Sequence, residues 1–211
     1  MNGVATSQAD VFAFSELEAA SVNAISADAR GYGYSALPSD PETVDVGILS
    51  RYPIIESDAG RWLARVVVAP PSTRPLVIYA VHAPLARFVE INGLRIGVDL
   101  TVRDAVVSAM RARIDYDIAQ GRTVVVMGDL NSTERERGYA EMAAGLRDSH
   151  LEAGTGPGLT WRPTSVIPVG LLRIDYIFST PDMSPTSSTV DCSLPSDHCR
   201  VDATLTIMGA P

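Results

Sequence analysis

The stretch VVVMGDLN, residues 124–131, decides how the rest of the chain is interpreted. Its β-branched run predicts a buried strand, and Gly128-Asp129-Leu130-Asn131 places a carboxylate and a carboxamide at the strand's C-terminal end. Asp129 and Asn131 are two residues apart, so an extended backbone projects both to one side, about 6 to 7 Å apart along the chain. Taken alone, the stretch is explained at least as well by a strand followed by an ordinary Asx turn.

Composition favours a single domain over residues 1–211, because nothing in the chain has the character of a linker. With 46% hydrophobic residues the chain can bury a substantial core. No segment approaches the roughly 18 uninterrupted apolar residues of a membrane span. The net charge of −8 argues against an extended basic groove for nucleic acid, so the expected partner is a small or locally gripped substrate. Nothing in the sequence indicates an oligomeric state.

Two further features concern the cellular compartment. Cys192 and Cys199 form either a short disulfide or two free thiols, and we favour free thiols. The N-terminal MNGVATSQAD has neither the basic nor the apolar segment of a secretory signal. The sequence as written therefore predicts a cytoplasmic protein, and a secreted or membrane-tethered one if N-terminal residues are missing.

Two polar side chains follow predicted strands in the first half of the chain. Residues 10–15, DVFAFS, lead to Glu16 before a helical run over 17–29. Residues 76–81, LVIYAV, lead to His82 and form a predicted antiparallel hairpin with the strand over 61–69. Each has a structural alternative, since a glutamate at a helix start complements the helix dipole and a lone histidine is more often a structural hydrogen-bonding residue.

Residues 101–120 are the clearest predicted helix, and they lead directly into VVVMGDLN. Apolar residues spaced by four mark the face expected to pack on the sheet: Val102, Val106, Met110, Ile114 and Ile118. The arginines of this helix, Arg103, Arg111 and Arg113, are interpreted as a solvated face. Residues 132–146 are predicted to be helical as well.

The C-terminal third carries Asp175 inside a predicted strand over 171–179, and Asp197-His198 before a last strand over 200–207. An unpaired charge inside an apolar strand costs several kcal/mol, so Asp175 is expected to have a partner. Four loop residues are candidate substrate contacts, although loop aromatics more often simply pack: Trp161, Arg162, Tyr32 and Tyr34.

The order of these motifs is informative. Glu16 after DVFAFS, then LSRYP, VH, GDLN, RIDYIF and SDH closely resemble the endonuclease/exonuclease/phosphatase (DNase I-like) superfamily over residues 10 to 205. GDLN followed by a terminal SDH is fairly specific as an ordered pair, whereas either motif alone is weak. The resemblance implies an α/β fold, a four-layer sandwich of two mostly antiparallel β-sheets flanked by helices.

The resemblance also implies a role for each residue. Glu16 and Asp197 are similar to the family's metal-side carboxylates, and such oxygens suit Mg²⁺ or Mn²⁺. Asp129 matches the residue that orients or deprotonates the attacking water, and Asn131 the amide that holds it or the phosphate. His198 matches the donor to a phosphoryl oxygen. Asp175 would hold that imidazole, and His82 is a candidate acid for the leaving oxygen.

One departure from the family pattern concerns the first strand. Relatives open with an asparagine-bearing strand some 20 to 30 residues before the glutamate, but only fifteen residues precede Glu16, and they do not resemble that strand. Ser15 and Tyr176 also differ from common family residues. The chain is therefore expected to lack the first family strand. Either it is a truncated form of a longer protein, or its start is placed too late, or it is a member without that strand whose metal site is weakened.

Two functions follow from this comparison. The first is a metal-dependent hydrolase of phosphoric esters, which hydrolyses a phosphodiester in a small, lipid-like or locally gripped nucleic acid substrate by in-line attack of water. The alternative is a repurposed family member that carries out non-hydrolytic small-molecule chemistry or binds a ligand. Clear stabilisation by Mg²⁺ would argue for the first and against a metal-independent protein.

Overall fold

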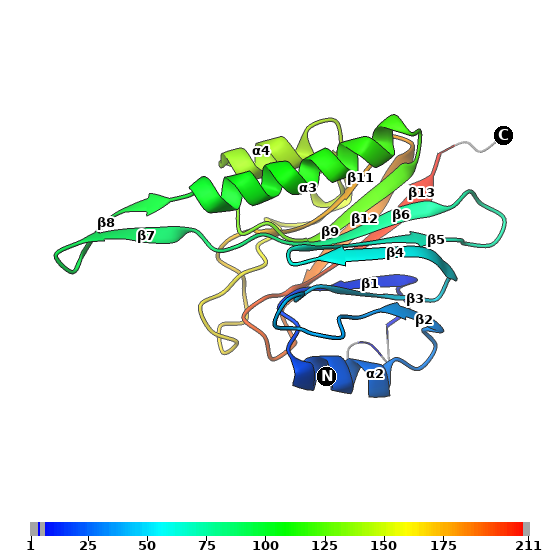
Figure 1. Cartoon of the computed structure of the whole chain (residues 1–211), viewed down its shortest axis with the longest axis horizontal. Coiled ribbons are helices and arrows are strands. Elements are labelled where there is room, and N and C mark those ends of the chain that lie inside the picture. The colour runs from blue at the N-terminus through cyan, green and yellow to red at the C-terminus, as the bar shows by residue number, and fades with distance from the viewer. Residues whose placement is uncertain (1–3, 5–6, 209–211) are drawn as a thin grey trace.

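The protein is built on a six-stranded sheet, described by a computed structural model that covers residue 4 and residues 7–208. The strand order is β10-β11-β9-β6-β5-β4. The strands are β4 (Ile54–Gly60), β5 (Leu63–Val68), β6 (Leu76–His82), β9 (Thr123–Asp129), β10 (Arg147–Asp148) and β11 (Asp175–Ser179). Only β6 and β9 pair in parallel, and the other neighbours are antiparallel. Helices α3 (Thr101–Ala119) and α4 (Arg137–Ala143) cover one face of this sheet (Figure 1).

A second sheet layer lies against the other face and is divided into two parts. One is the three-stranded sheet β1-β3-β2 and the other is the pair β12-β13. These strands are β1 (Val11–Phe14), β2 (Tyr34–Ala36), β3 (Gly47–Ser50), β12 (Met183–Asp191) and β13 (Arg200–Ile207). Helix α2 (Ala19–Asp28) packs outside β1-β3-β2, which completes the predicted four-layer α/β sandwich (Figure 1).

The VVV run of β9 explains why the layers hold together. Val124 and Val126 belong to the core beneath α3, whereas Val125 belongs to the core between the two sheets. Successive side chains of a strand point to opposite faces, so an uninterrupted apolar run is what a strand buried on both sides requires. The prediction of a buried strand at this position is confirmed.

Helix α3 confirms the predicted span and most of the predicted face, because Met110 and Ile114 are buried and Val106 and Ile118 pack against the same core. Its buried residues include Val107, Met110 and Ile114, whereas Val102 is exposed. Arg103 is buried as well, contrary to the interpretation of it as part of a solvated face. A strict spacing of four drifts around a helix of 3.6 residues per turn, so the stripe begins one residue later than the sequence pattern indicates.

Several elements were missed or are shorter than expected. Strand β4 and the hairpin β7 (Arg87–Ile91) with β8 (Leu94–Asp99) were not predicted. The hairpin projects from the body of the molecule and β8 is exposed throughout, so it lacks the alternation of a half-buried strand (Figure 1). The helix expected over 132–146 is limited to α4, and a further short helix, α5, spans Ser149–Ala153.

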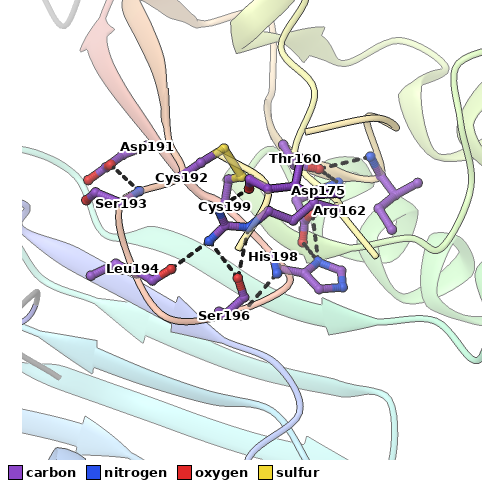
Figure 2. The surroundings of a disulfide bond; sticks show 12 residues. Thr160, Arg162, Asp175, Asp191, Cys192, Ser193, Leu194, Ser196, His198 and Cys199 are labelled. Atoms are coloured by element: carbon purple, nitrogen blue, oxygen red, sulfur yellow. Dashed lines mark hydrogen bonds and ion pairs between the residues drawn. A yellow bond between two sulfur atoms is a disulfide. The ribbon is translucent and has the colours of Figure 1, made fainter. Parts of the chain in front are cut away.

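The two cysteines form a disulfide, so the expectation of free thiols was wrong. The Cα atoms of Cys192 and Cys199 are 4.3 Å apart. Strands β12 and β13 pair so that Asp191 lies opposite Arg200. Cys192 follows Asp191 and Cys199 precedes Arg200, so both cysteines lie at the base of the connecting loop (Figure 2). The hairpin register therefore places the two sulfur atoms within bonding distance, which residue spacing alone does not reveal.

The N-terminal segment thought unlike the family's first strand lies partly outside the described residues. Within the described part of the chain, no helix is long and apolar enough to cross a membrane.

Gly128 gives a direct test of strand packing. It has φ 139°, and a Cβ there would overlap the carbonyl oxygen of Val81 on the neighbouring strand. We expect Gly128→Ala to lower the free energy of unfolding by about 2 to 4 kcal/mol in urea denaturation. Gly121→Ala is the matched control, because Gly121 also has positive φ but open space around its Cα, and it should cost about 1 kcal/mol. Equal losses in the two variants would contradict the proposed close approach.

Candidate active site

Strand register brings three of the predicted site residues into one row across the sheet. His82 at the end of β6 pairs with Asp129 at the end of parallel strand β9. Asp129 in turn pairs with Asp175, the first residue of antiparallel strand β11. The row therefore joins one strand end to the next, and residues far apart in the sequence meet at one edge of the six-stranded sheet.

Asp129 is the most deeply buried member of the row, with 1% of its surface exposed. Its Oδ1 accepts a hydrogen bond from the backbone N–H of Asn131 at 2.6 Å, whereas its buried Oδ2 has no hydrogen-bond partner among the described residues and lies 3.9 Å from Nε2 of His82. Burial, with a smaller contribution from the charge of Asp175, raises the pKa of Asp129 to about 7, although nearby His198 opposes the shift. This carboxylate can therefore exchange a proton near neutral pH.

Asn131 is held in a left-handed conformation, with φ 46°. Its side-chain Nδ2 donates to the carbonyl oxygen of Ala83 at 2.8 Å. Arg103 donates to the Asn131 carbonyl oxygen at 2.7 Å and also binds Glu136 at 2.9 Å. Arg103 is thus a positioning residue that the sequence pattern concealed, because an arginine between apolar helix positions is ordinarily solvated.

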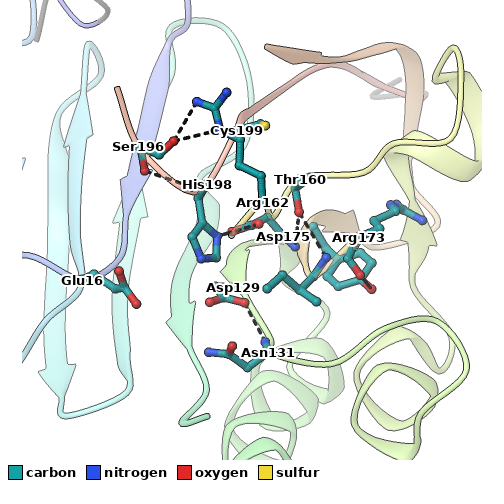
Figure 3. A network of polar contacts seen from close by, with 12 residues as sticks. Glu16, Asp129, Asn131, Thr160, Arg162, Arg173, Asp175, Ser196, His198 and Cys199 are labelled. Carbon is teal, nitrogen blue, oxygen red and sulfur yellow. Dashed lines mark hydrogen bonds and ion pairs between the residues drawn. The ribbon is translucent and has the colours of Figure 1, made fainter. Parts of the chain in front are cut away.

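Asp175 and His198 form the pair that the buried charge of Asp175 predicted. The His198 Nδ1 lies 3.1 and 3.0 Å from the two carboxylate oxygens of Asp175. Figure 3 shows the imidazole beside the carboxylate of Asp129, with Glu16 across the same space. Burial alone would lower the pKa of His198, but the hydrogen bond and charge of Asp175 outweigh it and raise the pKa to about 9. At neutral pH His198 is therefore a cation that can donate from Nε2.

His82 has a partner that sequence reasoning missed. Its Nδ1 lies 2.7 Å from Oδ2 of Asp45, a residue just before β3. Burial tends to lower the pKa of His82, but Asp45, followed by the charges of Asp129 and Glu16, raises it overall. The available signal was the one used for Asp175, because Asp45 is also a carboxylate inside an apolar run.

Glu16 reaches the site from the other sheet layer. It follows β1 with φ 56°, and its side chain is 56% exposed. Its Oε1 lies 3.8 Å from Nε2 of His82. The neighbouring backbone N–H of Leu17 donates to the carbonyl oxygen of Asp45 at 2.9 Å, which ties the Glu16 turn to the segment that holds His82.

The donor set fits a divalent cation. Ligand atoms of Asp129, Asp175 and His198 all lie within 4.8 Å of one another, and Glu16 faces the same space (Figure 3). Because His198 is protonated at neutral pH, the carboxylates are the groups available to a cation there. Hard carboxylate oxygens suit Mg²⁺ or Mn²⁺. The free Oδ2 of Asp129 is the strongest local indication, since a buried anionic oxygen without a hydrogen-bond donor is stabilised by a cation.

The remaining predicted residues are placed differently. The Asp197 side chain is exposed and lies outside the group of possible ligands found among the described residues. Arg162 is buried, and its guanidinium donates to the carbonyl oxygens of Leu194 and Ser196 (Figure 2) and to that of Ile167. Its donors stabilise the loop that carries His198.

The three aromatic candidates are also dispersed. Tyr32 is buried, and its hydroxyl donates to Ala9 at 2.6 Å. Tyr34 is exposed on β2, and half-buried Trp161 forms a backbone bridge with His198. Of these three residues, only Trp161 is paired through its backbone with a site residue, His198.

Comparisons with known proteins agree with this architecture. The sequence model of the endonuclease/exonuclease/phosphatase family matches residues 3–198. A mannosyl-6-phosphatase from Bacteroides thetaiotaomicron VPI-5482 is 15% identical with a TM-score of 0.75, covering 94% of this chain and 85% of that one. A mutant beta toxin from Staphylococcus aureus with bound magnesium ions is 16% identical with a TM-score of 0.64, covering 92% and 86%. At these identities the likeness concerns the fold. A search of curated proteins found no match.

The pairing of Asp175 with His198 predicts a specific titration. Asp175→Asn removes the carboxylate that raises the pKa of His198, so we expect that pKa to fall well below about 9. The measurement is an NMR titration of the His198 ring in metal-free protein. Asp197→Asn, which removes an exposed carboxylate next to His198 in sequence, is the control and should leave the titration nearly unchanged. An unaltered pKa in Asp175→Asn would contradict the pairing.

Burial of Asp129 predicts a pH-dependent gain in stability when its charge is removed. Because its pKa rises from 3.8 to about 7 on folding, the stabilisation from its protonation is present below pH 4 and lost as pH rises through 7. Asp129→Asn should therefore raise the free energy of unfolding by roughly 1 to 3 kcal/mol at pH 8 without metal, and by less at pH 5. Urea denaturation in EDTA at both pH values tests this. A gain independent of pH would exclude a role for the charge.

Proposed function

The chain belongs to the endonuclease/exonuclease/phosphatase family, and from this membership and the geometry of its site we propose that it is a divalent-metal-dependent phosphoesterase. The proposed reaction is hydrolysis of a phosphoric ester by in-line attack of water. The observation that carries the proposal is the buried, unpartnered Oδ2 of Asp129 between two histidine–carboxylate pairs.

The proposed roles follow from which atoms are already engaged. Asp129 keeps Oδ2 available to orient the attacking water and to accept its proton, while Asn131 fixes Oδ1. Glu16, with Asp175 nearby, would hold Mg²⁺ or Mn²⁺, which supplies positive charge against the phosphate oxygens when bound. In this proposal Asp197, whose side chain is exposed, contributes at most through its loop.

The two histidines would act on opposite parts of the ester. Protonated His198, held by Asp175 through Nδ1, donates from Nε2 to a phosphoryl oxygen as negative charge develops there. A preorganised donor of this kind is worth roughly 3 to 4 kcal/mol. His82, held by Asp45, donates a proton to the leaving oxygen as the bond from phosphorus to that oxygen breaks. The water oxygen ends on phosphorus, and its proton ends on Asp129.

The substrate class is proposed from charge and surroundings. The net charge of −8 disfavours long contacts with a nucleic acid backbone, so a small or lipid-like phosphodiester, or nucleic acid gripped at one point, fits better. The named neighbours include a mannosyl-6-phosphatase, which supports a phosphoester substrate without selecting one. Trp161, beside His198, is the aromatic residue best placed to contact it.

The proposal predicts metal-stimulated hydrolysis that depends on Asp129. Wild-type protein should hydrolyse a generic bis-aryl phosphate with Mg²⁺ or Mn²⁺, and Asp129→Ala should lower kcat by at least about 100-fold because the water loses its acceptor. Asp202→Asn, a carboxylate on β13 paired with Arg200 at 2.8 Å, is the control and should retain activity.

A second readout separates hydrolysis from the alternative of a metal-independent protein. Mg²⁺ should raise the melting temperature of wild-type protein and have a much smaller effect on Asp129→Ala. If the wild type shows neither metal-dependent stabilisation nor metal-stimulated hydrolysis of any phosphoester, a repurposed role replaces this proposal.

A further inference from the structure

Exposed apolar side chains gather on two segments beside the active site. Of the sixteen large apolar side chains that are exposed in the described part of the chain, six belong to residues 85–98 and four to residues 166–172. The first group is Leu85, Phe88, Val89, Leu94, Ile96 and Val98, and the second is Val166, Val169, Leu171 and Leu172. Single exposed apolar residues are ordinary on a protein surface, but such a concentration marks a contact site.

Both segments are attached directly to residues of the site. The β7–β8 hairpin begins shortly after His82, and the helix that follows it carries Arg103, which binds the Asn131 carbonyl oxygen. Residues 166–172 end at Leu172, whose carbonyl oxygen accepts a hydrogen bond from the backbone N–H of Trp161 at 2.8 Å. Trp161 in turn forms the backbone bridge with His198. The two apolar segments therefore lie at the end of the molecule that holds the site.

The hairpin presents apolar side chains on both of its faces. Phe88 and Val89 are consecutive in β7, so they point to opposite faces, and both are exposed. Phe88 lies opposite Val98, whereas Val89 lies opposite Gly97. The hairpin extends away from the body of the molecule (Figure 1). A protein partner with one complementary surface would cover one face only, whereas a lipid interface surrounds a projecting hairpin on all sides.

The charges of the hairpin indicate which kind of lipid surface it fits. Arg87 lies opposite Asp99, and Nε of Arg95 lies 3.2 Å from Oε1 of Glu90, so the charges of residues 85–99 cancel. Because the whole chain carries a net charge of −8, electrostatic attraction to an anionic membrane is disfavoured. Apolar contact with a zwitterionic surface remains. The Arg95 guanidinium carbon also lies 4.3 Å from the Phe88 ring centroid, and such a side chain buries its stem while its charge reaches the headgroups.

The backbone of the hairpin limits how deeply it can enter a membrane. Asn92 and Gly93 have φ 50° and 78°, as in a two-residue hairpin turn, and both are exposed at the tip. The outer edges of β7 and β8 have no partner strand among the described residues, and unpaired backbone groups are excluded from the hydrocarbon core. We propose that the β7–β8 hairpin, together with residues 166–172, docks the protein on a zwitterionic phospholipid membrane at the level of the headgroups.

A docked protein would hold its site against the phosphoesters of the lipid headgroups. Only residues 83–86 separate His82 from β7, so the hairpin cannot bind a surface without bringing the site near it. A phosphodiester carried by a lipid is then the expected substrate class, a step that rests on the proposed phosphoesterase function. Docking itself requires no hydrolysis, so a binding measurement tests it separately.

The test is co-sedimentation of the protein with phosphatidylcholine vesicles. Wild-type protein should bind, and Phe88→Ser/Ile96→Ser should lower the partition coefficient at least about tenfold, because two apolar side chains no longer leave water on docking. Tyr116→Ser/Ile55→Ser is the matched control on α3 and β4. Tyr116 and Ile55 are 67% and 56% exposed, against 58% and 59% for Phe88 and Ile96, so the control should bind as the wild type does.

A milder pair of variants guards against a hairpin that no longer folds. Leu94→Ser on β8 should weaken vesicle binding, whereas Leu151→Ser on α5 should not, and the two side chains are 70% and 65% exposed. A melting temperature close to that of the wild type shows that each variant is folded. Phosphatidylglycerol added to the vesicles should not strengthen binding, because the chain is acidic.

Three outcomes would overturn the proposal. Wild-type protein that does not sediment with phosphatidylcholine vesicles, or that binds only when phosphatidylglycerol is present, excludes docking by apolar contact. Equal losses of binding in the hairpin variants and their controls exclude the hairpin as the docking surface. A dimer that forms without lipid in analytical ultracentrifugation, and that Phe88→Ser/Ile96→Ser dissociates, would assign the hairpin to a second copy of the chain instead.

Discussion

The burial of Asp129 is the constraint on which the rest of the site depends. A carboxylate almost without exposure is costly to ionise, and the surrounding structure compensates on one side only, where the backbone of Asn131 binds Oδ1. The other oxygen accepts no hydrogen bond from any described residue. Burial of the Asp129 carboxylate thus lowers the stability of the fold at the position where water activation requires a proton acceptor. Active sites often retain such destabilising groups because the reaction needs them.

The buried scaffold around Asp129 accounts for its geometry. Parallel pairing with β6 and antiparallel pairing with β11 fix the neighbours on both sides, so His82 and Asp175 cannot shift relative to it without breaking the sheet. Arg103 fixes the position of Asn131 by donating a hydrogen bond to its carbonyl oxygen. The site is consequently as rigid as the six-stranded sheet, which is what positioning for in-line attack requires.

Sequence reasoning succeeded where a residue's own surroundings carried the signal. The apolar run before Asp129 predicted a buried strand, and the isolated charge of Asp175 predicted a partner, which the family resemblance named as His198. Sequence reasoning failed where a residue's partner is distant in the sequence, or where a buried polar residue interrupts the apolar pattern of a helix. Asp45 contacts His82 across the two sheet layers, and Arg103 occupies a helix position where burial depends on the Asn131 turn packed against it. The disulfide could not be predicted because it depends on the register of the β12–β13 hairpin. The β7–β8 hairpin could not be predicted because β8 is exposed throughout and lacks the alternation of a half-buried strand.

The two sheets contribute unequally to the site, and this asymmetry has a physical consequence. Asp129, Asp175 and His82 belong to the intact sheet, whereas Glu16 follows β1 in an interrupted one. Glu16 also has a left-handed backbone and an exposed side chain, so little besides the Leu17–Asp45 hydrogen bond fixes it. Water-handling groups are therefore preorganised by the core of the six-stranded sheet, while the position of the metal-side carboxylate depends on the divided second layer. His198 precedes β13 in the same divided layer, but its hydrogen bond to Asp175 ties it to the intact sheet, a link that Glu16 lacks.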